Sequence, residues 1–381
     1  MRVDEVETPV PVVDIDRLEA NISRLQSYLD KYGVANRPHI KTHKIPAIAQ
    51  MQMDAGAVGI TCQKVSEAEV MAEAGFTDIS IPYNIVGESK LNRLMLLAMK
   101  VNLSVTADSA YVIHGLSNAA QRAGLSLTVL VECDTGLHRC GVQSPQDAAE
   151  LARLVNQLPN VKFGGLMTYP TSDQTDIFVR ETRALLTKDG LHIERVSGGG
   201  TPAMWQVHEH PEITEHRAGI YVYGDRLTLR SGAVTLDTCA LKVHTTVVSR
   251  PTHERGILDA GSKSLSSDLH GLDGYGYICE YPNAKIYALS EEHGHVDFSA
   301  CDRKPEIGER LTIIPNHCCT VTSLFDEVVG ASGGHLAGHG TRYCQVNKIE
   351  TTSGRSNKTE ESILIPTQIF PLTCPINMAG V

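Results

Sequence analysis

The sequence lacks any apolar run of the roughly 18 residues that a membrane-spanning helix needs, so we expect no membrane span. It also lacks an excess of basic side chains, because its formal net charge is -10 at pH 7. A surface that binds nucleic acid would need a basic face, and we therefore expect none. A small-molecule ligand fits this composition better.

An apolar segment of the secretory kind is missing after the acidic residues 1–5, MRVDE, so secretion is not expected. The ten cysteines are spread over a chain that is too long to need disulfides for its stability. We therefore expect free thiols in a reducing compartment, with a metal ligand as the possible exception, and a cytoplasmic protein.

The glycine pattern G-x-G-x-x-G of an open dinucleotide-binding sheet is absent from the early part of the chain. Residues 8–228 instead alternate between strand-like and helix-like segments, with eight strands that end at Lys41 and at residues 61, 81, 105, 132, 168, 197 and 223. Eight such repeats predict an α/β fold, a (β/α)8 TIM-type barrel. Residues 229–330, together with 1–7, predict a mostly antiparallel β domain, and residues 331–381 an atypical, weakly ordered tail.

The end of the first predicted strand carries a dense group of basic side chains, residues 37–44, RPHIKTHK. Burial and neighbouring cations both disfavour an ammonium group, so Lys41 is a candidate for an imine-forming amine. A solvated basic loop would explain the same residues.

Two other strand ends carry residues that fit a phosphate-bearing cofactor. Arg139 follows the fifth strand, and three glycines with Thr201 follow the seventh, where bare backbone amides can close on phosphate. An amine, a phosphate cradle and an arginine at one barrel mouth indicate pyridoxal phosphate. A sugar-phosphate enzyme that forms an imine with its substrate remains the alternative.

His317 and Cys319 offer imidazole and thiolate two residues apart in the second predicted domain. On an extended chain both side chains point the same way, so they could share one metal ion. His293, which follows two glutamates, is another possible ligand or proton carrier, although a charged turn would look the same.

Taken as an ordered set over residues 7–329, these segments resemble the D-threonine aldolase and D-serine dehydratase family. Its members are fold-type III pyridoxal phosphate enzymes related to alanine racemase. The likeness is carried by residues 37–44 (RPHIKTHK), 62–69 (CQKVSEAE), 134–142 (DTGLHRCGV), 198–201 (GGGT), 259–264 (DAGSKS), 292–294 (EHG) and 317–319 (HCC).

The resemblance implies a role for each matching position. Lys41 resembles the Schiff-base lysine, Arg139 the arginine at the cofactor's phenolic oxygen, and Arg217 the arginine that faces the pyridine nitrogen. His317 and Cys319 resemble the metal ligands of the dehydratases, and the thiolate favours zinc over manganese. The other residues that the resemblance places at the cofactor are His39, Gly199, Gly200, Thr201, Gly219 and Ile220.

The resemblance also implies a reaction class. Tyr169 matches the aldolases, but Pro170 stands where they carry a histidine thought to deprotonate the β-hydroxyl, so His293 or metal-bound hydroxide would have to replace it. We therefore expect a metal-assisted lyase that cleaves a D-3-hydroxy amino acid to glycine and an aldehyde. A D-serine or D-3-hydroxyaspartate dehydratase is the alternative, and an amino-acid racemase or a non-catalytic vitamin B6 carrier would be further readings. Related enzymes close their site between subunits, which implies a homodimer.

Overall fold

The computed structural model describes residues 2–337 and 342–344, and its strands form two sheets within one compact unit. No helix among these residues is long and apolar enough to cross a membrane. The eight cysteines among residues 2–337 are free thiols. The predicted weakly ordered tail lies largely outside the described residues.

The first sheet is a parallel barrel of eight strands in the order β2-β9-β8-β7-β6-β5-β4-β3. A parallel bridge between His39 and Thr61 joins its two ends and closes it. This confirms the predicted (β/α)8 barrel. The strands are β2 (Ala35–Asn36), β3 (Ile60–Thr61), β4 (Asp78–Asn84), β5 (Asn102–Ala107), β6 (Leu127–Asp134), β7 (Val161–Tyr169), β8 (Val196–Gly198) and β9 (Glu215–His216).

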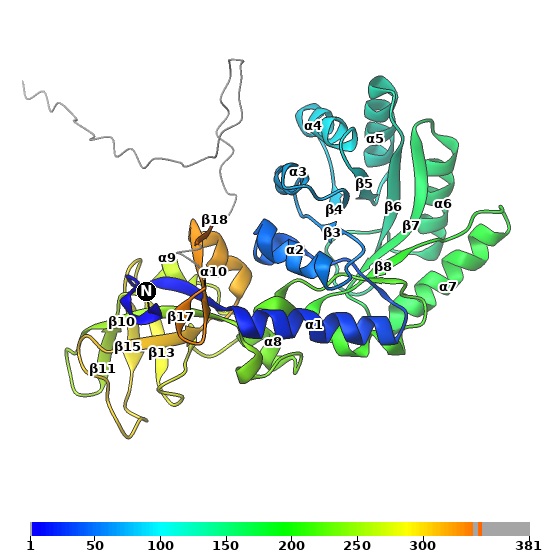
Figure 1. The fold of residues 1–381 in the computed structure, drawn as a ribbon. Coiled ribbons are helices and arrows are strands. Elements are labelled where there is room, and N and C mark those ends of the chain that lie inside the picture. Colours follow the sequence, from blue (N-terminus) through cyan, green and yellow to red (C-terminus); the bar gives the residue numbers. More distant parts are fainter. Residues whose placement is uncertain (1, 338–341, 345–381) are drawn as a thin grey trace, which may run out of the picture. The chain divides into compact units, whose positions relative to one another are not determined.

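Helices follow most of these strands and lie outside them, as Figure 1 shows for α4 to α7. They are α1 (Ile15–Lys31), α2 (Pro46–Asp54), α3 (Val65–Glu73), α4 (Glu88–Ala98), α5 (Ala110–Ala123), α6 (Pro145–Gln157), α7 (Asp173–Thr187) and α8 (Arg226–Arg230). Short 3-10 helices complete the connections: η2 (Ile40–Thr42), η3 (Thr201–Glu209), η4 (Ile220–Val222) and η5 (Leu236–Thr238).

Helix α1 shows how the apolar pattern builds this layer. Its cap is Asp14, whose side chain accepts a hydrogen bond from the Arg17 amide. Its apolar stripe, which includes Leu18 and Leu25, is buried in the core.

The eighth barrel strand was predicted wrongly. Residues 220–222 form η4, and the strand that completes the barrel is the polar pair Glu215–His216. Arg217 therefore comes directly after this strand. The Glu215 carboxylate is buried and paired with Arg37, 2.7 Å away, which explains how a charged residue is accommodated inside the barrel.

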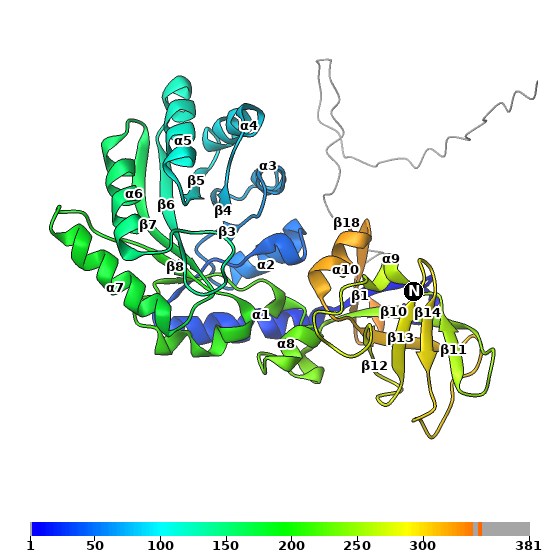
Figure 2. The ribbon, with the colours of Figure 1, turned by 180° about the vertical axis from the view of Figure 1, so that it is seen from behind.

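The second sheet is mostly antiparallel, and Figure 2 shows β10, β11, β13 and β14 of this sheet. Strand β1 lies within it, antiparallel to β10 and parallel to β16, although the sequence placed these residues in the barrel domain. The elements are η1 (Val3–Glu5), β1 (Val10–Asp14), β10 (Leu241–Ser249), β11 (Arg255–Leu258), α9 (Ser262–Leu265), β12 (Tyr277–Ile278), β13 (Lys285–Leu289), β14 (Gly294–Asp297), β15 (Arg310–Ile314), α10 (Cys318–Leu324), β16 (Glu327–Ser332), β17 (His335–Leu336) and β18 (Arg342–Cys344).

Candidate active site

A cavity of about 280 Å³ gathers most of the residues singled out in the sequence. It lies where the loops after the barrel strands meet the segment between β15 and α10. The singled-out residues that line it are His39, Lys41, Arg139, Tyr169, Gly200, Thr201, Arg217, Gly219, Ile220, His317 and Cys319.

Lys41 lies in η2, and the first barrel strand, β2, already ends at Asn36, so the predicted strand end at Lys41 was wrong. Burial lowers the pKa of its amine; the Cys319 thiolate opposes this shift, and the charge of Arg139 adds to it. The direction is the one that the sequence reasoning expected. The amine is thereby brought closer to the uncharged form that can attack a carbonyl group.

His39 caps η2 and is held by a contact of 3.0 Å between its Nε2 and Oε1 of Gln63. Burial, together with the charges of Lys41 and Arg217, holds the pKa of His39 well below its usual range. The imidazole is therefore neutral at physiological pH, and its ring can stand beside an aromatic cofactor without adding charge.

The loop after β8 has the backbone form of an anion cradle. Gly199 and Gly200 have φ angles of +142° and +125°, which favour glycine. A Cβ on Gly199 would lie 2.6 Å from the Arg217 backbone nitrogen, and one on Gly200 2.9 Å from Cε2 of Tyr169. Gly199 does not line the cavity itself; its amide donates to Oγ1 of Thr171 at 2.8 Å and so holds the loop in place.

Thr201, the next residue, carries a buried hydroxyl that has no hydrogen-bond partner among the residues that the structure describes. A buried polar group without a partner costs free energy, so its presence beside a glycine loop needs an explanation. A phosphate group bound at the loop would supply the missing acceptor. The residues present therefore fit the phosphate end of pyridoxal phosphate.

Arg217 lies at the base of the cavity, where its guanidinium donates to Oγ of Ser197 at 2.7 Å and to the Thr168 carbonyl at 3.1 Å. Burial lowers the pKa of Arg217 to about 10, so it is still a cation at neutral pH. Arg139 comes from the loop after β6, and its guanidinium lies 5.4 Å from the centre of the Tyr169 ring. Two cations thus border the cavity.

Glu132 lies near the end of β6, and the sequence analysis assigned it no role. Burial and the nearby Asp108 carboxylate raise its pKa to about 7, while Arg139 and Arg217 act in the opposite direction. The sequence did contain a signal for Glu132, because its carboxyl group stands near the end of an apolar strand, seven positions before Arg139.

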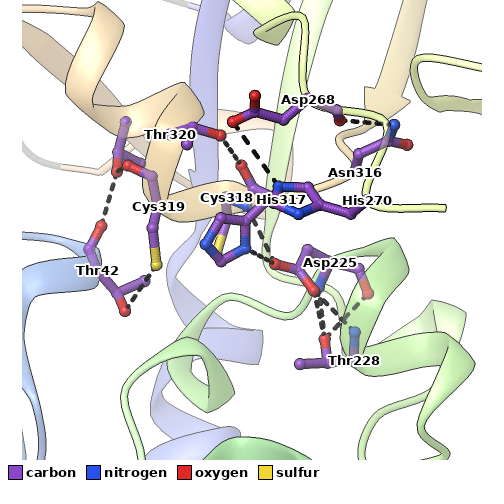
Figure 3. A network of polar contacts seen from close by, with 11 residues as sticks. Thr42, Asp225, Thr228, Asp268, His270, Asn316, His317, Cys318, Cys319 and Thr320 are labelled. Atoms are coloured by element: carbon purple, nitrogen blue, oxygen red, sulfur yellow. Dashed lines mark hydrogen bonds and ion pairs between the residues drawn. The ribbon is translucent and has the colours of Figure 1, made fainter. Parts of the chain in front are cut away.

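The candidate metal ligands lie at the start of α10, so the argument from an extended chain was wrong. Only His317, which precedes the helix, is extended, and Cys318 is already in the first turn and buried in the core. His317 and Cys319 nevertheless both reach the cavity wall. Figure 3 shows Cys319 on the side of Thr42, whose hydroxyl lies 3.3 Å from its sulfur.

The pKa values of both side chains are shifted by polar and charged neighbours. Burial alone would lower the pKa of His317, but hydrogen bonds to Asp225 and Cys319 raise it to about 10. Contact with the Cys318 thiol, and then with His317, lowers the pKa of Cys319 well below its usual value. The thiolate is the form that binds metals.

Within residues 2–337 and 342–344, no group of three or more histidine, cysteine or acidic side chains is arranged to hold a metal ion. His317 and Cys319 would supply two ligands, and substrate or solvent the others. The pair fits a soft divalent ion in its donor types.

His293 is a second singled-out residue, besides Gly199, that does not line the cavity. It lies exposed in the turn between β13 and β14, and its carbonyl accepts from the Ser290 amide at 2.9 Å. The adjacent Glu292 pairs with Lys263 at 2.8 Å. Within one chain, the alternative of a charged turn describes this segment better than a proton carrier does.

Comparison with known proteins bears on this cavity directly. Residues 13–227 match the family model described as "Alanine racemase, N-terminal domain", and residues 240–331 match the "Putative serine dehydratase domain". A D-threonine aldolase of Arthrobacter sp. is 35% identical over 347 residues, which are 86% of this chain and 90% of that protein. The chain belongs to the D-threonine aldolase and D-serine dehydratase family. It is thereby a member of a family of pyridoxal phosphate-dependent lyases that act on D-amino acids.

Solved structures of this family have the same fold. D-threonine aldolase from Filomicrobium marinum superimposes with a TM-score of 0.80 at 32% identity, over 90% of this chain and 95% of that one. A cysteine-to-alanine variant of D-threo-3-hydroxyaspartate dehydratase, in its metal-free form, gives 0.80 at 28% identity, over 92% and 100%. The family therefore includes both carbon–carbon cleavage and dehydration.

Proposed function

We propose that this chain is a metal-assisted, pyridoxal phosphate-dependent lyase that cleaves D-3-hydroxy amino acids to glycine and an aldehyde. One observation carries the proposal: the Lys41 amine, the glycine loop with Thr201, and the His317 and Cys319 pair all border a single cavity. An amine, an anion cradle and a thiolate–imidazole pair are the separate requirements of imine formation, phosphate binding and metal binding.

Pyridoxal phosphate would be held by Lys41 at its aldehyde carbon and, at its phosphate, by Gly200 and Thr201 of the loop that Gly199 shapes. When bound, it withdraws electrons from the α-carbon of the substrate. Arg217 keeps its charge at neutral pH and is proposed to face the ring nitrogen. Gly219 and Ile220, which also line the cavity, are proposed to extend the phosphate side.

The cleavage moves two protons. The bond between Cα and Cβ breaks, the β-hydroxyl loses its proton to solvent in the cavity and becomes the aldehyde oxygen, and Cα of glycine gains a proton. Lys41 is proposed to hold the proton that Cα receives, because its amine borders the cavity and burial lowers its pKa. Tyr169, which also lines the cavity, is proposed to hydrogen-bond the β-hydroxyl.

A divalent ion, zinc in preference to manganese, is proposed at His317 and Cys319 because thiolate is a soft ligand. Such an ion stabilises the deprotonated form of a hydroxyl group bound to it. The related dehydratase, whose cysteine-to-alanine variant is described in a metal-free form, supports this assignment.

The test is a product assay with the protein loaded with pyridoxal phosphate and zinc. D-threonine should yield acetaldehyde and glycine, and a chelator should abolish the activity. Lys41→Ala should lose the visible absorbance of the bound cofactor and the peptide adduct that borohydride fixes at this residue. Keto acid without aldehyde would overturn the aldolase assignment.

Dehydration of D-serine or D-3-hydroxyaspartate is the second candidate. It is favoured by the thiolate at Cys319 and by Pro170, which stands where the aldolases have a base. In that reaction Lys41 would remove the α-proton and hydroxide would leave from Cβ. Pyruvate and ammonia from D-serine would identify it.

We further propose a homodimer. Exposed apolar side chains lie at or after the carboxyl ends of three adjacent barrel strands, namely Tyr83, Val86, Tyr111 and Leu137, which are 42% to 75% exposed. Exposed apolar side chains that gather at one end of a barrel favour an interface. Light scattering on the purified chain should give twice the monomer mass.

A further inference from the structure

Asp225 joins the barrel to the candidate metal ligands, and its two carboxylate oxygens have separate partners. Its side chain is fully buried at the start of α8. Oδ1 accepts from the amide of Thr228 at 2.9 Å, which caps the helix. Oδ2 lies 3.1 Å from Nδ1 of His317 and accepts from the amide of Cys318 at 3.1 Å (Figure 3).

The direction of the bond to His317 follows from what a carboxylate can do. An ionised carboxylate only accepts hydrogen bonds, so the shared proton belongs to Nδ1 of the imidazole. Nδ1 therefore keeps its proton, and Nε2 is the ring nitrogen that can lose its proton and bind a metal ion. His270, whose ring meets that of His317 edge-on with centroids 5.3 Å apart, packs against the same side chain.

We infer that Asp225 is a positioning residue that selects the tautomer and fixes the ring plane of His317, so that Nε2 is preset for a divalent metal ion. The inference rests on the proposal that His317 and Cys319 bind that ion. It also links the ligands to the barrel, because the same carboxylate holds the first turn of α8. The metal pair is thus fixed to the part of the chain that carries Lys41.

The decisive variant is Asp225→Asn, which changes the donor pattern with little change in shape. Asparagine caps helices as well as aspartate does, so its oxygen can keep the bond to the Thr228 amide. Its NH₂ group then faces Nδ1 of His317, which must accept, and the proton moves to Nε2. The Cys318 amide loses its acceptor in the same change, as it also does in Asp225→Ser. A comparable exchange at the orienting aspartate of a serine protease leaves the geometry intact but gives the wrong tautomer.

The measurement is zinc affinity of the full chain. The protein is freed of metal and titrated with Zn²⁺ in competition with a chromophoric chelator, without substrate. Partners of metal ligands are typically worth about 10- to 100-fold in metal affinity, and we expect a loss of this size for Asp225→Asn. Nitrogen-15 NMR of the zinc-loaded protein should show the proton of His317 on Nδ1.

Two further variants separate orientation from charge and from folding. Asp268→Asn removes a carboxylate that lies 3.8 Å from His270 and makes no contact with His317, so it controls for lost negative charge and should bind zinc within about 3-fold of the unmodified chain. Asp225→Ser retains a capping oxygen but is too short to reach the ring, and it should bind zinc more weakly than the unmodified chain but more tightly than Asp225→Asn.

Three results would overturn the inference: Asp225→Asn that binds zinc like the unmodified chain, Asp268→Asn that loses as much affinity as Asp225→Asn, or a proton on Nε2 in the zinc-loaded protein. A different result would refute the proposed metal site itself. If His317→Ala bound zinc as tightly as the unmodified chain, the ligands would lie elsewhere.

Discussion

At the scale of single residues, the site contains ionisable side chains whose pKa values are shifted by burial, such as Lys41 and Glu132. It also contains the buried Thr201 hydroxyl, which has no hydrogen-bond partner within the described residues. Lys41 and Arg139 could be predicted from the sequence, because basic side chains at the ends of barrel strands mark such sites. Asp225 could not, since it lies 92 residues before His317 and nothing in the local pattern relates the two. Sequence spacing reveals a pair only when both residues lie on one element.

Glu132 provides a test of the site's electrostatics through stability. Its pKa rises from the ordinary 4.5 to about 7 in the folded chain, so the folded state holds a proton that the unfolded state has lost between these pH values. The stabilisation is present below pH 4.5 and disappears as pH rises through 7. Glu132→Gln should therefore gain stability relative to the unmodified chain on going from pH 5 to pH 8, by up to about 3 kcal/mol.

Urea unfolding of both proteins at several pH values would measure this difference. Glu150→Gln, on the exposed surface of α6, is the matched control and should show no such trend. A difference for Glu132→Gln that stays constant with pH would contradict the shifted pKa.

Thr201 should give opposite effects on stability and on cofactor binding. Thr201→Val removes a buried hydroxyl without a partner, so the cofactor-free chain should gain about 1 kcal/mol in unfolding free energy while its affinity for pyridoxal phosphate falls. Thr171→Val is the control, because it leaves the Gly199 amide unpaired and should destabilise the cofactor-free chain. Denaturant unfolding and fluorescence titration with the cofactor would show whether both signs hold.

At the scale of elements, the strands that were predicted best are the apolar ones. Strands such as β6 and β7 are buried on both sides of the barrel wall and appear as continuous apolar runs. The polar strand β9 was missed because an ion pair, and not apolar character, supports Glu215 inside the barrel. The apolar run at η4 was misread because a buried 3-10 turn needs the same residues as a buried strand.

Two hydrogen bonds connect η2, which carries Lys41, to α10, whose first turn contains Cys319. The Thr322 hydroxyl donates to the carbonyl of Thr42 at 2.7 Å, and the hydroxyl of Thr42 lies 3.3 Å from the sulfur of Cys319. Thr322→Val should lower the unfolding free energy by about 1 kcal/mol and also reduce kcat, because it loosens the spacing between amine and metal.

Thr320→Val is the comparison for this pair of elements, since its hydroxyl bonds only to the carbonyl of His317 within the same segment. It should lower stability with little effect on kcat. Equal losses of kcat in the two variants would show that the link between η2 and α10 has no special role.

At the scale of the whole molecule, the chain passes between its two sheets twice. Strand β1 belongs to the second sheet, the barrel follows, and β10 returns to the second sheet beside β1. The sequence predicted the barrel and the antiparallel character of the second part. It could not predict this partner of β1, because pairing between strands more than two hundred residues apart leaves no periodic signal.

Because β1 lies between β10 and β16, we expect a charge introduced into it to lower the unfolding free energy strongly. Val13 is fully buried and pairs with Leu241 on one side and Gly330 on the other. Val13→Asp should cost more than about 4 kcal/mol, since it buries an unpaired charge. Val58→Asp, at a site that is 47% exposed, should change stability by less than about 0.5 kcal/mol. Thermal unfolding would compare them, and similar melting temperatures would rule out the proposed role of β1.

The position of β1 also bears on the order in which the chain can fold during synthesis. Val12 pairs with Lys242 on one side and with Val329 on the other, so β1 waits for neighbours that are both translated after the barrel. The barrel residues lie between β1 and these neighbours and can close earlier. A chain truncated after residue 240 should therefore protect its barrel from protease while residues 2–14 remain open to cleavage, and protection of residues 2–14 would mean that β1 has a partner other than β10 and β16.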